Sequence, residues 1–122
     1  MKVTGAPTFD HASISDSIAR TAKNYDSVPY PSYPYPRLQP ARLSAITRLL
    51  GLSTQPAATA RTLEIGCAAG GHIIPLAAAA PRAYFVGIDV SPAQIGQGLA
   101  RIERLGLTNI ELRCRIVTDL GP

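Results

Sequence analysis

Two short apolar stretches, each followed by residues with a special backbone or polar role, constrain the fold of this chain most. The first, residues 62–66, runs directly into a turn at 66–71 that is rich in glycine. The second, residues 83–89, follows about one helix later and ends at Asp89. A strand, a glycine turn, a helix and a second strand form a βαβ unit with parallel strands. The spacing therefore predicts an α/β fold.

The elements that follow are predicted by periodicity and by helix start and stop signals. We expect the helix after the glycine turn at about 70–80. Residues 91–94, Ser-Pro-Ala-Gln, form a capping box with proline at N1, and they start a helix that Gly106 stops. Alternating apolar and charged side chains predict a third strand at 109–117. Right-handed crossovers then give a Rossmann-like parallel sheet in the order 3-2-1 with flanking helices, apparently truncated before a fourth strand.

The glycine turn and the acid after the second strand together form a candidate nucleotide-cofactor site. Glycines let a ligand approach the backbone, and the next helix presents free N–H groups. Asp89 lies 23 positions after Gly66 (89 − 66), near the roughly 20-residue offset of a ribose-binding acid. A dinucleotide fingerprint needs G-x-G-x-x-G, which Gly66, Ala68 and Gly70 do not supply. An NAD-type dehydrogenase is therefore disfavoured.

The pattern is instead E-x-G-x-A-x-G, with Glu64 two residues before the first glycine. This arrangement resembles the class I S-adenosylmethionine-dependent methyltransferases, whose first motif is an acid followed by G-x-G-x-G. The resemblance extends over residues 62–112. The segment 25–36, rich in tyrosine and proline, is similar to the lead-in of a subgroup whose longer members carry a methyltransferase regulatory domain behind the catalytic one.

The resemblance implies a role for each residue of the candidate site. The small residues of the turn would lie beneath the methionine and ribose portion of S-adenosylmethionine. Glu64 would orient the amino-acid end of this cofactor, and Asp89 would accept hydrogen bonds from the ribose hydroxyls. Ile88 and Val90 would flank the adenine. The expected cofactor-binding residues are Glu64, Gly66, Cys67, Ala68, Gly70, Asp89 and Val90.

Two positions depart from the pattern of the family. Ala68 stands where a glycine is usual, and it adds a methyl group where the backbone and the ligand approach closely. Ile116 stands about where an acid commonly meets the adenine amino group, and Asp119 is a poor substitute three residues later. The family's catalytic and acceptor-binding residues usually follow the fourth strand, so we assign no catalytic residue. His72, at the start of a helix, receives no catalytic role either.

The first fifty residues are predicted to form two helices joined by a strap. Apolar spacing predicts helices at 11–24 and at 41–50, the second docking on the sheet. Prolines and tyrosines alternate between them, at 28–40, and favour an extended polyproline II strap. Three roles stay open for this strap: a lid over the cofactor or acceptor site, a ligand for a partner's aromatic groove, and a simple surface tether. We therefore expect an N-terminal helix and strap at 1–40 and the first half of a methyltransferase domain at 41–122.

Charge, hydropathy and cysteine content exclude several classes of protein. The formal charge is +4, but the arginines are dispersed without a basic run, so we expect no nucleic-acid partner. No apolar run approaches the roughly 18 residues of a membrane span, and the start of the chain has no secretory pattern. We therefore expect a cytoplasmic protein. Cys67 and Cys114 match neither a metal-ligand spacing nor a disulfide scaffold, so no metal is expected.

Two functions from different classes follow from these observations. The first is methyl transfer from S-adenosylmethionine to an unidentified acceptor, for which this chain supplies the cofactor-binding half. The second is a truncated, non-catalytic module that binds a partner through its open sheet edge or its proline-rich strap. The same open edge of the first strand also predicts self-association.

Overall fold

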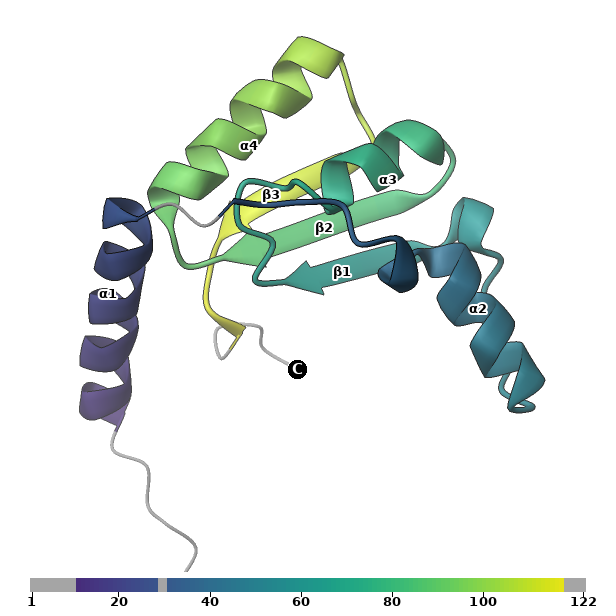
Figure 1. Ribbon diagram of the computed structural model, residues 1–122, viewed down its shortest axis with the longest axis horizontal. Coiled ribbons are helices and arrows are strands. Elements are labelled where there is room, and N and C mark those ends of the chain that lie inside the picture. The colour runs from purple at the N-terminus through teal and green to yellow at the C-terminus, as the bar shows by residue number, and fades with distance from the viewer. Residues whose placement is uncertain (1–10, 29–30, 118–122) are drawn as a thin grey trace, which may run out of the picture.

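The computed structural model describes residues 11–28 and 31–117, which form a small parallel sheet with helices around it (Figure 1). No helix within these ranges is long and apolar enough to cross a membrane. The helices and strands are α1 (His11–Ser27), α2 (Pro40–Leu49), β1 (Arg61–Ile65), α3 (Ile73–Ala79), β2 (Tyr84–Asp89), α4 (Pro92–Leu105) and β3 (Ile110–Cys114), with short 3-10 turns η1 (Pro36–Leu38) and η2 (Ala57–Thr59).

The sheet has the strand order β1-β2-β3, and both neighbouring pairs are parallel. This confirms the predicted Rossmann-like order 3-2-1. In Figure 1, α3 and α4 lie on the same side of the sheet, as right-handed crossovers require. The core fills the space between the sheet and these two helices. Its fully buried members include Phe85, Ile73 and Ala77.

The bounds of α4 agree with the predicted ones because local signals at both ends set them. The hydroxyl of Ser91 accepts a hydrogen bond from the backbone N–H of Gln94 at 3.1 Å, as an N-cap does. At the other end Gly106 has a φ of 62°, the left-handed conformation of a helix C-cap. Pro92 occupies the first turn, where its missing N–H leaves no hydrogen bond unmade.

The helix after the glycine turn begins later than its predicted start. It starts at Ile73, three residues after Gly70, because the backbone of Gly70 has a φ of 74°, which a right-handed helix does not allow. Pro75 consequently falls in the first turn of α3, where a missing N–H is tolerated. The third strand ends at Cys114, three residues before its predicted end.

Helix α2 forms where it was predicted, but the prediction that it docks on the sheet is wrong. None of its residues is buried, and Leu49 is 87% exposed. Gly51 has a φ of 77°, and the chain after it turns back along the helix, where Ser44 and Thr54 share a hydrogen bond of 3.0 Å. The helix contacts η1 and η2, and it extends away from the sheet in Figure 1.

The strap is extended only in part. Residues 31–35 have no regular secondary structure, and one 3-10 turn, η1, follows them. The backbone of Gly71 donates to the hydroxyl of Ser32 at 2.8 Å, and the backbone of Tyr35 donates to Nδ1 of His72 at 2.9 Å. The strap is therefore fastened to the glycine turn, while the predicted division of the chain at residue 40 stays a prediction.

Candidate functional site

The loop after β1 is held against the end of β2 by its own backbone. The N–H groups of Gly66 and Cys67 both donate to the carbonyl of Ile88, at 2.8 and 3.0 Å. Gly66, Ala68 and Gly70 have φ values of 74°, 49° and 74°, so every second residue of the loop adopts a left-handed conformation. Such a conformation is ordinary for glycine and strained for alanine. The alternation folds the loop tightly at the carboxyl end of the sheet.

Asp89 joins this loop to the start of α4. One carboxylate oxygen accepts from the backbone N–H of Ala68 at 2.8 Å, and the other accepts from the backbone N–H of Ser91 at 3.0 Å. A carboxylate oxygen can accept more than one hydrogen bond, so both oxygens keep capacity for a ligand. The side chain thus orders the two loops and still offers acceptors to whatever lies between them.

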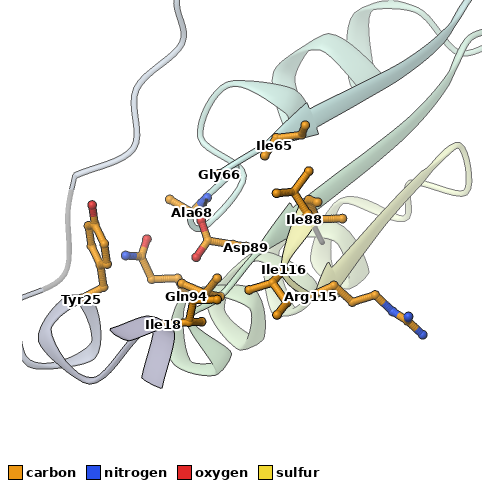
Figure 2. A pocket seen from close by; sticks show the side chains of 12 residues that line it. Ile18, Tyr25, Ile65, Gly66, Ala68, Ile88, Asp89, Gln94, Arg115 and Ile116 are labelled. Carbon is orange, nitrogen blue, oxygen red and sulfur yellow. Dashed lines mark hydrogen bonds between the residues drawn. The ribbon is translucent and has the colours of Figure 1, made fainter. Parts of the chain in front are cut away.

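A cleft of about 490 Å³ opens beside Asp89, between the carboxyl end of the sheet and α1 (Figure 2). This volume lies within the roughly 300–1,000 Å³ range of small-molecule sites. Polar groups line one end of the cleft, namely Asp89, Gln94 and the backbone of the glycine loop, and Arg115 also lines the cleft. The apolar side chains that line it are Ile18, Ile65, Ile88, Val90, Ile116 and Val117. One polar end and an extended apolar wall suit a nucleoside.

Four of the predicted cofactor-binding residues line this cleft: Gly66, Ala68, Asp89 and Val90. Gly70 lies farther along the loop, where an added Cβ would meet the side chain of Ile74. These positions are consistent with the roles that the resemblance implies. The roles themselves stay predictions.

Cys67, also predicted at the site, turns its side chain into the core. The residue is 2% exposed, and Gly87 lies so close to it that a Cβ there would be 2.8 Å from the sulfur. Burial, together with the carboxylates of Asp89 and Glu64, raises the pKa of the Cys67 thiol to about 12. The thiol therefore stays protonated, and any contribution of Cys67 to a ligand comes from its backbone.

Glu64 carries a buried carboxyl oxygen that no donor among the described residues reaches. Burial raises the pKa of this side chain from 4.5 to about 7. A carboxyl group with a pKa near neutrality, on the strand that leads into a glycine loop, is a candidate functional group. A cationic group brought close to it would restore its ionised form.

Helix α1 contributes two cleft residues that the sequence did not single out, Ile18 and Tyr25. The helix is fastened to the rest of the site because Asp26 accepts a hydrogen bond from the hydroxyl of Ser91. Figure 2 shows Tyr25 and Ile18 on the α1 side of the cleft and Ile88 on the sheet side. Only the tertiary structure brings these segments together, so no local sequence signal could have identified them.

Gln94 is a third cleft residue that was missed, although its backbone role in the capping box was predicted. Ile116 lines the cleft, and its expected place near the adenine stays a prediction. Asp119, the substitute acid considered for that place, lies outside the described residues. His72 lies 6% exposed at the start of α3, where its Nδ1 holds the strap.

A glycine loop after β1, an acid at the end of β2 and a nucleoside-sized cleft between them define a class I S-adenosylmethionine-dependent methyltransferase domain. The model of the family described as "Putative methyltransferase" matches residues 58–119, about half of the chain. The chain belongs to this family. This confirms the resemblance that the glycine pattern and the two acids indicated.

Two proteins of known sequence are similar to this chain over part of their length. Uncharacterized protein RP789 of Rickettsia prowazekii (strain Madrid E) is 44% identical over 96 residues, which are 79% of this chain and 17% of that protein. A tRNA (guanine-N(7)-)-methyltransferase of Chloroflexus aggregans (strain MD-66 / DSM 9485) is 47% identical over 49 residues, which are 40% of this chain and 22% of that protein. The chain therefore spans about a fifth of the length of these relatives.

A solved structure shares the fold at a level that also supports the family. PKMT2 of Rickettsia typhi, in complex with AdoHcy, matches with a TM-score of 0.71 and 32% identity over 76% of this chain and 18% of that chain. AdoHcy, S-adenosylhomocysteine, is what S-adenosylmethionine becomes when it gives up its methyl group. The cofactor predicted from the sequence is thus the cofactor of the family.

Proposed function

We propose that this chain binds S-adenosylmethionine in the cleft beside Asp89 and supplies the cofactor-binding part of a methyltransferase. The observation that carries the proposal is the position of the Asp89 carboxylate, which lines the cleft and bridges the glycine loop and α4. In a βαβ unit an acid at this place binds the ribose hydroxyls of a nucleotide.

The residues present fit the chemistry of this cofactor. The carboxylate oxygens of Asp89 retain lone pairs for hydroxyl donors. Ile88, Val90 and Ile116 offer apolar surface for an adenine ring. The buried, unpartnered oxygen of Glu64 suits the ammonium group of the amino-acid end.

When bound, the cofactor supplies a sulfonium whose methyl group is already activated toward a nucleophile, and the protein's task is to position and desolvate it. The apolar wall and α1 would exclude water from the nucleoside. The glycine loop would let the backbone approach the ligand closely. The acceptor stays unidentified in this proposal.

Calorimetric titration of the chain with S-adenosylhomocysteine tests the proposal. We expect saturable binding by the wild-type chain and a loss of about tenfold or more in affinity for Asp89→Ala, because a charged hydrogen bond to the ribose disappears. Asp16→Ala is the matched control, since Asp16 is an exposed carboxylate outside the cleft. The proposal fails if the folded wild-type chain shows no saturable binding, or if Asp89→Ala binds as tightly as Asp16→Ala does.

A second candidate function, binding of a partner or a second copy, is favoured by the outer edge of the sheet. Leu63 and Ile65 on β1 are 50% and 59% exposed, and β1 pairs with one strand only among the described residues. An unpaired strand with apolar side chains is a template for association. Sedimentation velocity at micromolar concentration tests binding of a second copy: we expect an oligomer that Leu63→Lys dissociates, and a monomeric wild-type chain would remove self-association.

A further inference from the structure

The imidazole of His72 accepts a hydrogen bond from the strap, and this bond fixes the protonation state of the ring. The backbone N–H of Tyr35 donates to Nδ1 of His72 at 2.9 Å. A backbone amide can only donate, so Nδ1 must offer a lone pair, and the proton of the neutral ring lies on Nε2. If the ring gained a second proton, both nitrogens would be donors and this bond could not form. The contact therefore needs a neutral histidine.

Further contacts at the same place hold the strap against the glycine turn. The N–H of Gly71 donates to the hydroxyl of Ser32 at 2.8 Å, and the ring of Tyr35 meets the ring of His72 edge-on, with 5.7 Å between the centroids. In Figure 1 the strap passes the start of α3 on its way to α2. His72 is only 6% exposed at this junction. A change in the charge of its ring therefore acts directly on the strap.

The groups around the imidazole offer little to stabilise a charged ring. From the strap it faces the ring of Tyr35, and α3 carries no titratable residue. The turn contributes Cys67, whose raised pKa keeps it a neutral thiol. A cation is already present at the turn, because Arg101 of α4 donates to the carbonyl of Ala69 at 3.4 Å. His72 is also the N-cap of α3, where the helix dipole disfavours positive charge.

No carboxylate near the turn compensates a charged imidazole. Asp89 uses its two oxygens on the backbone N–H groups of Ala68 and Ser91. One oxygen of Glu64 has no donor within reach, and no acid in the described part of the chain forms an ion pair with His72. A proton added to the ring thus leaves a charge without a partner at a buried junction, which is unfavourable until the strap leaves and water enters.

We propose that His72 is a proton-sensitive latch that holds the strap on the glycine turn when its ring is neutral and releases the strap when its ring is protonated. Histidine is the side chain whose charge ordinarily changes between about pH 5 and 8. The open state binds one proton more than the closed state, so the closed strap is favoured as the pH rises and is lost as the pH falls. Release frees the N–H of Gly71 and uncovers the turn, so the strap is a lid and not a simple tether.

Amide exchange measures the latch at its own hydrogen bonds. The exchange rates of the N–H groups of Tyr35 and Gly71, each compared with the intrinsic rate at the same pH, give protection factors between about pH 5.5 and pH 8. His72→Asn keeps an acceptor that does not titrate, and His72→Phe keeps a ring without an acceptor. His11→Gln, at the other histidine of the chain, is the matched control. Circular dichroism checks that each variant is folded.

We expect the protection of both N–H groups to fall about tenfold or more from pH 8 to pH 5.5 in the wild-type chain and in His11→Gln, because a fastening hydrogen bond is lost. Protection should stay high at every pH in His72→Asn and low at every pH in His72→Phe. Glu64 cannot imitate this result. Its pKa of about 7 lies in the same range, but its protonation as the pH falls stabilises the folded state and would raise protection.

A second measurement needs only the wild-type chain, so the inference stays testable if the His72 variants do not fold. Nitrogen-15 spectra show which nitrogen of each imidazole carries a proton, and we expect only Nε2 of His72 to do so at pH 8. A proton on Nδ1 at that pH overturns the inference, and so does protection of Tyr35 that does not fall with pH. An equal fall in His72→Asn overturns it as well. None of these readouts depends on the cofactor, so the proposed function is tested separately.

Discussion

Asp26, in the last turn of α1, accepts a hydrogen bond from the hydroxyl of Ser91, the N-cap of α4. A carboxylate is unfavourable near the C-terminus of its own helix, but it is favourable near the N-terminus of another. The placement is therefore explained by the contact between the two helices. The contact fixes the end of α1 that carries Tyr25 into the cleft.

Substitution of Asp26 by alanine should weaken cofactor binding more than it weakens the fold. We expect the Kd for S-adenosylhomocysteine to rise by about three- to tenfold, since a charge-assisted hydrogen bond that orders α1 is lost. Asp26→Asn should lose less, because its amide oxygen can still accept from Ser91. Asp16→Ala, on the same helix, serves as the control. Equal affinities of the Asp26 and Asp16 variants would show that α1 does not contribute to binding.

Gly71 allows the strap to cross the glycine turn. A Cβ at this position would overlap the backbone of Ser32, which is no flexible side chain that could move aside. We expect Gly71→Ala to detach the strap and to accelerate tryptic cleavage after Arg37, in η1, by about tenfold or more, because local opening sets this rate. Gly96→Ala is the control, since nothing lies within 4 Å of a Cβ there. A cleavage rate that Gly71→Ala leaves unchanged would contradict the close approach of strap and turn.

The features that the sequence predicted well are those that short stretches of chain determine. The glycine turn, the acid after the second strand and the caps at Ser91 and Gly106 are all local signals, and the structure has them where they were expected. Parallel pairing followed because two strands joined through a helix run parallel. The strand order followed because such a crossover connection is almost always right-handed. The strand order could therefore be predicted without any knowledge of tertiary contacts.

The features that the sequence did not predict depend on what a side chain meets. Helical periodicity shows that α2 has an apolar face, but it does not show that the short turns η1 and η2 are the main neighbours of this helix. Tyr25 and Asp89 line one cleft although they are 64 positions apart (89 − 25). The capping box gave a backbone role to Gln94 and concealed the burial of its side chain.

Ala68 stores strain in the glycine loop, because its φ of 49° is left-handed and it is not glycine. Such a conformation costs an L-residue roughly 1–2 kcal/mol. Glycine would relieve this cost, but it also gives the unfolded chain more entropy, which offsets part of the gain in stability. We expect Ala68→Gly to raise the free energy of unfolding by up to about 1 kcal/mol. Ala100→Gly, in the exposed interior of α4, should lower it by about 0.5–1 kcal/mol. Urea unfolding measures both, and a loss of stability in Ala68→Gly would argue against the strain.

Glu64 should make the stability of the free chain depend on pH. Burial raises its pKa from 4.5 to about 7, so the folded state holds a proton that the unfolded state has already released in this interval. The free energy of unfolding should therefore fall as the pH rises from 4.5 to 7. Glu64→Gln, which stays neutral, should flatten this dependence in urea unfolding measured at pH 5 and pH 8.

The same side chain should couple cofactor binding to proton release. If the ammonium group of S-adenosylhomocysteine lies against Glu64, it lowers the pKa of the carboxyl group, and binding near pH 6 expels up to one proton. Calorimetric titration in two buffers of different ionisation enthalpy measures this number directly. The affinity should rise with pH up to about 7, the pKa of the free chain's carboxyl group. Glu64→Gln should bind without proton release, and an unchanged proton count in this variant would place the ammonium group elsewhere.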